Sequence, residues 1–148
     1  MLAACSAPEQ APDLGYTLLD GRTTRLAAFR GQVVLLRFWA TNCTICVHEM
    51  PALVALDARF RDQGLATLAV AMPYDAPAAV ADFAQSRHLP FGVVIDNTGE
   101  FAHRFGDVQA TPTTVLIDRR GRIVRRDVGA PDPAAFERSV AALIAEPA

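Results

Sequence analysis

The sequence has no lysine, so all 14 of its basic residues are arginine. We attribute this absence, and the abundance of alanine, to coding bias, and no function follows from either. No apolar run approaches the 18 or more residues of a membrane-spanning helix. The net charge of −2 and the lack of a basic patch interleaved with aromatic residues do not suggest a nucleic-acid partner. With 148 residues, half of them hydrophobic, the chain has the size and the apolar content of one domain with a real core.

Cysteine is also scarce, and only Cys43 and Cys46 of the three lie close together in the sequence. A zinc site would need a second cluster of ligands, but the third cysteine and the three histidines are scattered. Haem attachment needs a histidine directly after the second cysteine, where this chain has Val47. A structural disulfide across so short a ring would remove little chain entropy. A redox-active dithiol needs only what is present, so we predict one, with no metal and no other cofactor.

This pair is predicted to lie where a buried strand ends and a helix begins. The run from Val33 to Trp39 has the apolar character of a central strand, and residues 44–62 have helical spacing that ends at Gly64. The first turn of a helix has unpaired N–H groups and the positive end of the macrodipole, so it stabilises a thiolate. Lowering a thiol pKa from about 8.5 to about 7 takes roughly 2 kcal/mol, which such a helix end and neighbouring donors can supply.

The rest of the chain alternates strands with helices. A β-hairpin is predicted over residues 16–26, and Asp75 is predicted to cap a helix over residues 75–87. The other predicted elements are strands over 65–71, 91–95, 113–117 and 122–128, and helices over 98–105 and 132–144. This order predicts an α/β fold with helices on both faces of a central mixed sheet. Functional residues gather at the carboxyl ends of strands in such sheets, and Cys43 follows one of those ends.

The remaining cysteine, Cys5, ends the stretch Leu2-Ala3-Ala4-Cys5, which resembles a bacterial lipobox. The apolar region of a secretion signal does not precede it. We predict a lipidated Cys5, while a chance match in an alanine-rich sequence is the alternative. Ser6 to Asp13 is rich in proline, alanine and polar residues and predicts a flexible tether. The predicted organisation is therefore a tether over residues 1–13 and one domain over residues 14–148.

The motifs together resemble the thioredoxin superfamily. They are a strand ending in Trp39-Ala40, the Cys43–Cys46 pair, Pro51 in the following helix, and Thr111-Pro112 before a later strand. The long spacing between the cysteines and Thr111 leaves room for an extra αβ unit. With Glu49 and residues 112–118, this resembles the branch of TlpA and ResA, membrane-tethered disulfide reductases of the bacterial envelope. The resemblance covers roughly residues 13–145 and implies a thioredoxin-like fold with an N-terminal β-hairpin and an inserted αβ unit.

The resemblance also implies roles for the residues around the dithiol. Cys43 would be the nucleophile, and Cys46 would resolve the mixed disulfide. Thr111-Pro112 would form a cis peptide beside the dithiol, with the Thr111 backbone free to pair with an extended substrate segment. Trp39 would complete the substrate-binding set and pack under the dithiol.

Two charged residues are predicted to adjust the thiol pKa values. Glu49 lies one helical turn beyond Cys46, where a carboxylate would raise them or shuttle a proton. A solvated helix charge is the alternative for Glu49. Arg37 occupies the position of the buried aspartate of thioredoxin, and a buried arginine needs a partner, for which Glu49 is the candidate. The sequence also departs from the pattern of the family that it resembles, which usually has an aromatic residue where this chain has Asn42. Thr44-Ile45 stands between the cysteines in place of the Gly-Pro of thioredoxin.

We therefore expect an envelope thiol–disulfide oxidoreductase, acting on the periplasmic side as a reductase and reaching the membrane only through a lipid anchor. Its expected partners are protein disulfide substrates and a membrane thiol protein that donates electrons, and it is expected to be a monomer. Two rival hypotheses remain. In a copper-binding assembly protein, Cys43, Cys46 and either His48 or His103 would be ligands. A peroxiredoxin-type peroxidase would need a threonine three residues before its cysteine, whereas Thr41 lies two residues before Cys43.

Overall fold

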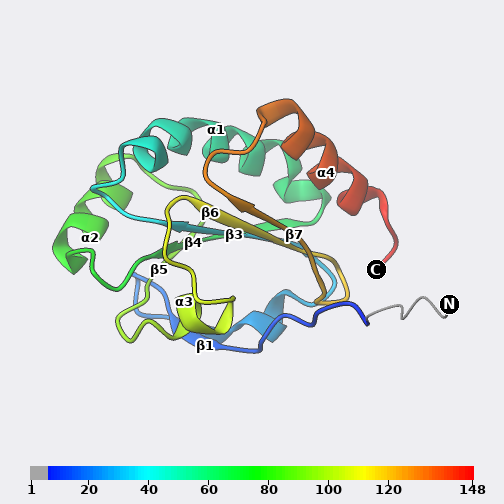
Figure 1. Cartoon of the computed structure of the whole chain (residues 1–148). Helices are drawn as coiled ribbons and strands as arrows, with labels where there is room; N and C mark the ends of the chain where they lie inside the picture. Colours follow the sequence, from blue (N-terminus) through cyan, green and yellow to red (C-terminus); the bar gives the residue numbers. More distant parts are fainter. Residues whose placement is uncertain (1–6) are drawn as a thin grey trace, which may run out of the picture.

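A computed structural model describes residues 7–148, so the predicted anchor at Cys5 lies outside the described residues. The chain folds around a five-stranded mixed sheet of order β5-β4-β3-β6-β7, and a two-stranded sheet, β1-β2, lies beside it (Figure 1). The strands are β1 (Gly15–Thr17), β2 (Thr23–Arg25), β3 (Val33–Trp39), β4 (Leu65–Ala71), β5 (Gly92–Ile95), β6 (Thr113–Ile117) and β7 (Ile123–Val128). The helices are α1 (Thr44–Phe60), α2 (Pro77–Ser86), α3 (Glu100–Arg104) and α4 (Pro133–Ala145), with short 3-10 turns η1 (Leu26–Phe29) and η2 (Arg61–Gln63). This is the predicted thioredoxin-like α/β fold.

Strand β3 is the centre of the sheet and is buried along its whole length. It runs parallel to β4 and antiparallel to β6. Its side chains alternate between two apolar clusters. Val33, Leu35 and Trp39 pack with α1, α2 and α4, while Val34, Leu36 and Phe38 pack with α3 and the β1-β2 sheet. The two-sided burial explains why the apolar run of this strand predicted a central position.

Arg119, in the turn between β6 and β7, ties three distant segments to that turn. Its guanidinium donates hydrogen bonds to three backbone carbonyls, those of Gly31, Gln63 and Ile144. Gly64, which follows η2, has φ 109°, and a Cβ there would come within 2.6 Å of the Arg119 guanidinium. Glycine at this position therefore serves both the left-handed backbone and the close approach of Arg119.

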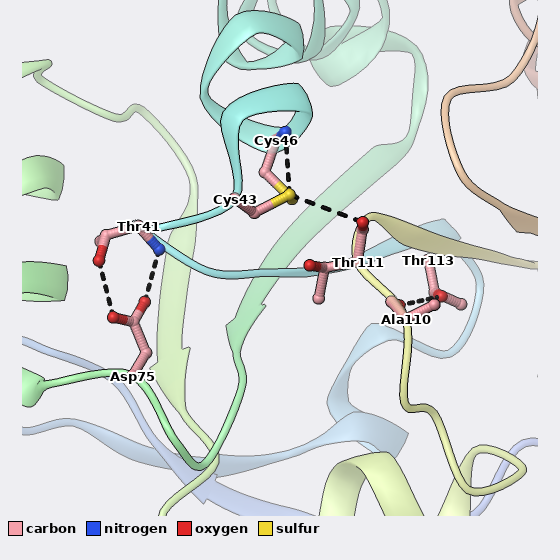
Figure 2. Close-up of a disulfide and its surroundings, with 7 residues drawn as sticks. All are labelled: Thr41, Cys43, Cys46, Asp75, Ala110, Thr111 and Thr113. Atoms are coloured by element: carbon pink, nitrogen blue, oxygen red, sulfur yellow. Dashed lines mark hydrogen bonds between the residues drawn. A yellow bond between two sulfur atoms is a disulfide. The ribbon is translucent and has the colours of Figure 1, made fainter.

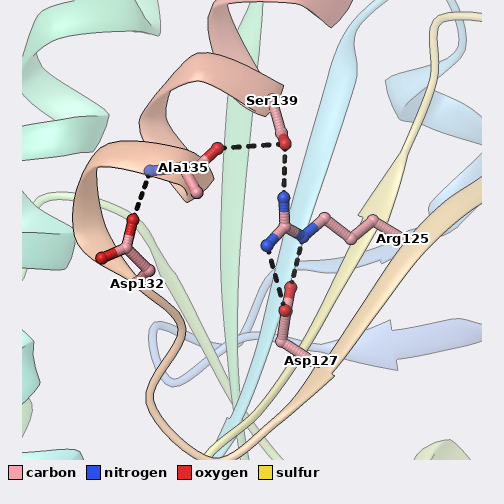
Figure 3. Close-up of polar contacts among 5 residues, drawn as sticks. All are labelled: Arg125, Asp127, Asp132, Ala135 and Ser139. Atoms are coloured by element: carbon pink, nitrogen blue, oxygen red, sulfur yellow. Dashed lines mark hydrogen bonds and ion pairs between the residues drawn. The ribbon is translucent and has the colours of Figure 1, made fainter.

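Helix α4 is held on the sheet by polar contacts at its first two turns (Figure 3). Asp132 is its N-cap and accepts a hydrogen bond from the Ala135 N–H at 2.8 Å, which confirms the predicted helix start. Arg125 of β7 makes a two-pronged contact with Asp127, at 2.7 and 3.1 Å, and also donates to the hydroxyl of Ser139. The strand and the helix are thus joined by hydrogen bonds as well as by apolar packing.

The segment before β1 differs from the flexible tether that its composition predicted. The Ile123 N–H donates to the Glu9 carbonyl at 2.7 Å, and the Ala11 N–H donates to the Gly121 carbonyl at 2.8 Å. The Glu9 carboxylate accepts two hydrogen bonds from Arg126, at 2.8 and 2.9 Å. Strand β7 is at the edge of the sheet, so its outer backbone groups are available for such pairing. From Glu9 onward the chain is docked on the domain.

Two predicted helix starts also differ from the structure. Helix α2 begins at Pro77 with Ala76 as its N-cap, and no side chain caps it, so Asp75 does not have the predicted role. Helix α3 begins at Glu100, and the buried carboxylate of Asp96 accepts from the N–H groups of Phe101 and Ala102, each at 3.0 Å. Asp96 thus binds the first turn of the helix that follows it, whereas Asp75 is not bound to the helix that follows it.

Candidate active site

Cys43 and Cys46 form a disulfide at the junction of β3 and α1 (Figure 2). Cys43 is the N-cap of α1, and its Sγ accepts a hydrogen bond from the Cys46 N–H at 3.2 Å. The side chain of Cys46 is buried with 2% exposure, whereas Cys43 is partly exposed. An incoming group can therefore reach Cys43 but not Cys46. The helix N–H aimed at Cys43 is the group expected to stabilise a thiolate there.

The loop before β6 passes directly beside this disulfide. The peptide bond between Thr111 and Pro112 is cis, and the Thr111 carbonyl oxygen lies 3.6 Å from the Cys43 Sγ (Figure 2). The loop is fixed on both sides, because the Gly129 N–H donates to the Pro112 carbonyl and the Thr113 hydroxyl donates to the Ala110 carbonyl. Pro112 is buried and Thr111 is partly exposed. Thr111 is thus a partly exposed residue directly beside the partly exposed Cys43.

Trp39, which the sequence analysis counted among the substrate-binding residues, is fully buried. It packs in the same cluster as Cys46, and its ring lies 5.1 Å from the ring of Phe83. The alternation along β3 directs it under α1 and away from solvent. Trp39 supports the disulfide from below and does not offer a surface to a substrate.

Arg37 and Glu49 lie on the same side of the sheet but do not form the predicted ion pair. Arg37 is 5% exposed, and its Nε has no hydrogen-bond partner among residues 7–148. Burial lowers the pKa of Arg37, while the charges of Glu49 and Asp127 oppose this lowering. Arg37 and Glu49 face a cleft of about 350 Å³ between α1 and the start of α4, together with Ala52, Leu53, Ala55, Leu56, Arg59, Pro131, Pro133, Phe136 and Glu137.

One contact at the site was not predicted from the sequence. The carboxylate of Asp75 accepts hydrogen bonds from the Thr41 N–H at 2.6 Å and from the Thr41 hydroxyl at 2.7 Å (Figure 2). Strands β3 and β4 are parallel neighbours, so the loops after them meet at one edge of the sheet. That adjacency was the available signal, and the nearby Pro77 obscured it by suggesting a helix cap.

Among residues 7–148, no three histidine, cysteine, aspartate or glutamate side chains lie close enough together to hold a metal ion. His48 is exposed, and His103 instead contacts the carboxylate of Asp107. Within the same described residues, no helix is both long and apolar enough to span a bilayer.

Comparison with known proteins places this geometry in a family. The family model described as Redoxin matches residues 6–144, which is most of the chain. The chain belongs to the Redoxin family. One relative of this Redoxin chain is the thiol-disulfide oxidoreductase ResA of Bacillus thuringiensis subsp. konkukian, 33% identical over 82% of this chain and 69% of the relative. The ResA of Geobacillus thermodenitrificans is 37% identical over 81% of this chain and 68% of that relative.

Solved structures agree with this assignment. A thiol:disulfide interchange protein described as DsbE, from Chlorobium tepidum, is 28% identical, with a TM-score of 0.85 over 93% of the Redoxin chain and 96% of its own. The exposed lipoprotein thioredoxin of Streptococcus pneumoniae is 26% identical, with a TM-score of 0.78 over 89% of this chain and 100% of its own. The Redoxin chain is therefore a ResA-like, thioredoxin-like thiol–disulfide oxidoreductase.

Proposed function

We propose that the protein reduces disulfides of other proteins through the Cys43–Cys46 pair. The observation that carries this proposal is the position of the Cys43 Sγ, which is accessible at the tip of α1 and lies 3.6 Å from the carbonyl oxygen of Thr111. In this proposal an extended substrate segment pairs with the backbone of Thr111, which brings the substrate disulfide against Cys43.

The proposed reaction has two exchange steps. The Cys43 thiolate attacks one sulfur of the substrate disulfide, forms a mixed disulfide and releases the other substrate sulfur as a thiolate. The Cys46 thiolate then attacks the Cys43 Sγ, which closes the disulfide of the enzyme and releases the second substrate thiolate. Two electrons pass to the substrate, and two protons convert its thiolates to thiols. A thiol protein at the membrane is proposed to return the two electrons to Cys43–Cys46.

Alanine variants test this order of steps. Cys43→Ala is expected to abolish the reduction of insulin disulfides. Cys46→Ala is expected to accumulate mixed disulfides with substrates, because nothing resolves the first step. Cys5→Ala is the matched control. It should reduce insulin as fast as wild type and should not accumulate mixed disulfides. If either variant of the pair reduces insulin as fast as wild type, the mechanism is wrong.

Glu49 is proposed to raise the thiol pKa values by repulsion between its carboxylate and the thiolate, which disfavours the ionised thiol. Glu49→Gln should therefore move the thiol titration to lower pH. Glu137→Gln is the matched control, because Glu137 lines the same cleft from α4 and is paired with Arg59. An unchanged titration in Glu49→Gln would leave Glu49 as a surface charge only.

The proposed location is the periplasmic side of a bacterial envelope, with a lipid anchor at Cys5. The pneumococcal relative, described as an exposed lipoprotein, supports this proposal. Expression behind a secretion signal should give a lipid-modified Cys5 that mass spectrometry detects and that Cys5→Ser lacks. A soluble product with a free thiol at Cys5 would refute the anchor and leave the exchange chemistry unaffected.

A further inference from the structure

We propose that Asp75 is a positioning residue for the nucleophile, acting on Cys43 through Thr41. The proposal rests on the role of Cys43 given above and assigns the cause of its placement to a loop from the neighbouring strand. Asp75 touches neither sulfur. Its effect would be to keep the turn before Cys43 in the one conformation that aims the sulfur at its donor.

The contact between the two loops is short and shielded. The Met72 N–H donates to the Trp39 carbonyl at 2.9 Å, which continues the pairing of the two strands one residue past the end of β4. Asp75 follows three residues later with 7% exposure, and each of its carboxylate oxygens accepts one hydrogen bond from Thr41. A buried carboxylate without such donors would be costly, so the two donors of Thr41 and the carboxylate hold each other in place.

The fixed turn determines where the sulfur lies. The Cys43 N–H donates to the Ala40 carbonyl at 3.1 Å and closes a turn with Thr41 and Asn42 in its middle. That turn does not use the N–H and hydroxyl of Thr41, and Asp75 binds both from outside. Two residues farther on, the Cys43 Sγ accepts the Cys46 N–H at 3.2 Å. If the turn loosens, the sulfur spends less time at this donor, and the thiolate becomes less stable.

The charge of Asp75 would act in the opposite direction. A carboxylate near a thiolate raises the thiol pKa by repulsion, so loss of the charge alone would lower that pKa. Loss of the positioning would raise it. We expect positioning to dominate, because the Cys46 N–H is in direct contact with the sulfur, whereas both oxygens of Asp75 are bound to Thr41. The sign of the shift therefore separates the two explanations.

The test measures the rate at which iodoacetamide alkylates Cys43 in the reduced full chain as a function of pH, with the modified peptide identified by mass spectrometry. Asp75→Ala should raise the pKa of the Cys43 thiol and slow alkylation at pH 7 by about 10-fold, as expected for loss of one hydrogen bond to a charged group. Asp75→Asn keeps an acceptor oxygen and Thr41→Ser keeps a hydroxyl, so the alkylation rate of both variants should stay within about 3-fold of wild type. Thr41→Val loses the hydroxyl and should fall between these limits.

Asp96→Ala is the matched control. Asp96 is also a buried aspartate at the end of a parallel strand, with 3% exposure and two N–H donors, but those donors belong to α3. Its replacement should lower the free energy of unfolding and leave the alkylation profile of Cys43 unchanged.

A folded Asp75→Ala variant whose thiol pKa is unchanged or lowered would overturn the proposal. An equal rise in Asp96→Ala would overturn it too, because general loosening would then be the cause. If Asp75→Ala does not fold, equal profiles for Thr41→Val and Thr41→Ser would refute the positioning, and a slower Thr41→Val alone would support it. Alkylation needs no protein substrate, so failure of wild type to reduce insulin would count against the proposed function and not against this inference.

Discussion

Replacement of Arg37 by methionine is expected to stabilise the protein. Arg37 is 5% exposed as a whole residue, and its Nε lacks a hydrogen-bond partner among residues 7–148. Burial also lowers the pKa of Arg37, which means that the charged form is held at a cost. Methionine is unbranched and apolar, so it can follow the same path through the core without a charge.

The size of the effect follows from two opposing contributions. Exchanging a buried ion pair for apolar side chains of similar volume is often neutral or stabilises by about 1–4 kcal/mol, and Arg37 has no ion-pair partner to lose within the described part of the chain. Against this, Glu49 and Asp127 lose a nearby cation, but Asp127 keeps its two hydrogen bonds from Arg125 and Glu49 is only half-buried. Loss of the attraction between Glu49 and the Arg37 charge costs up to about 1 kcal/mol. We therefore expect Arg37→Met to raise the free energy of unfolding by about 1–2 kcal/mol.

Urea unfolding of the oxidised protein measures this difference. With a slope of about 2 kcal/mol per M, the midpoint should rise by about 0.5–1 M. Arg59→Met is the matched control, because Arg59 lines the same cleft but is largely exposed and paired with Glu137. Its midpoint should not change. An Arg37→Met midpoint below that of wild type would refute the reasoning, since it would mean that the cleft satisfies the guanidinium.

Three further changes have definite expected outcomes. The N–H groups that bind the buried carboxylate of Asp118 outweigh its burial and lower its pKa. The ionised Asp118 therefore contributes its full stabilisation of the fold above about pH 4, and this contribution is lost as the pH falls through the lowered pKa of the folded protein. Asp118→Asn should lower the free energy of unfolding by about 1 kcal/mol at pH 7. In a plot of that free energy against pH, the variant should fall less steeply on the acid side than wild type. Arg119→Ala should lower the free energy of urea unfolding by about 3 kcal/mol, because three carbonyls lose their hydrogen-bond donor. A lysine cannot reach all three carbonyls at once, so wild-type stability in Arg119→Lys would contradict this explanation. Asp132→Ala should cost about 1 kcal/mol in thermal unfolding, whereas Asp132→Ser should cost little, and equal losses would exclude a cap.

The central strands could be predicted from the sequence residue by residue. The predicted and observed bounds of β3, β4 and β6 coincide. Each is a short apolar run between turn residues, and burial on both faces leaves few other structures for such a run. The cysteine pair at the strand-to-helix junction was predictable for the same reason, because the strand before it and the helical spacing after it are both strong patterns.

Contacts between distant segments could not be predicted in this way. Asp75 lies next to Pro77 and has the local pattern of a helix cap, yet its partner Thr41 is 34 residues earlier in the chain. The docking of Glu9 on Arg126 depends on a free sheet edge that composition does not reveal. Arg37 was placed correctly in a buried strand, but whether its side chain reaches Glu49 depends on side-chain geometry that no sequence pattern describes.

The turn between β6 and β7 lies at the opposite end of β6 from Pro112 and the disulfide. Gly121 of this turn holds the incoming chain through the Ala11 N–H, and Arg119 binds the Ile144 carbonyl near the outgoing end, so the first described residues and the C-terminus share one pole of the molecule (Figure 1). A fusion partner, a bead or a surface can therefore be attached at that pole while Cys43, at the opposite pole, stays accessible. For the proposed protein substrates, this polarity lets one end be occupied without crowding the other.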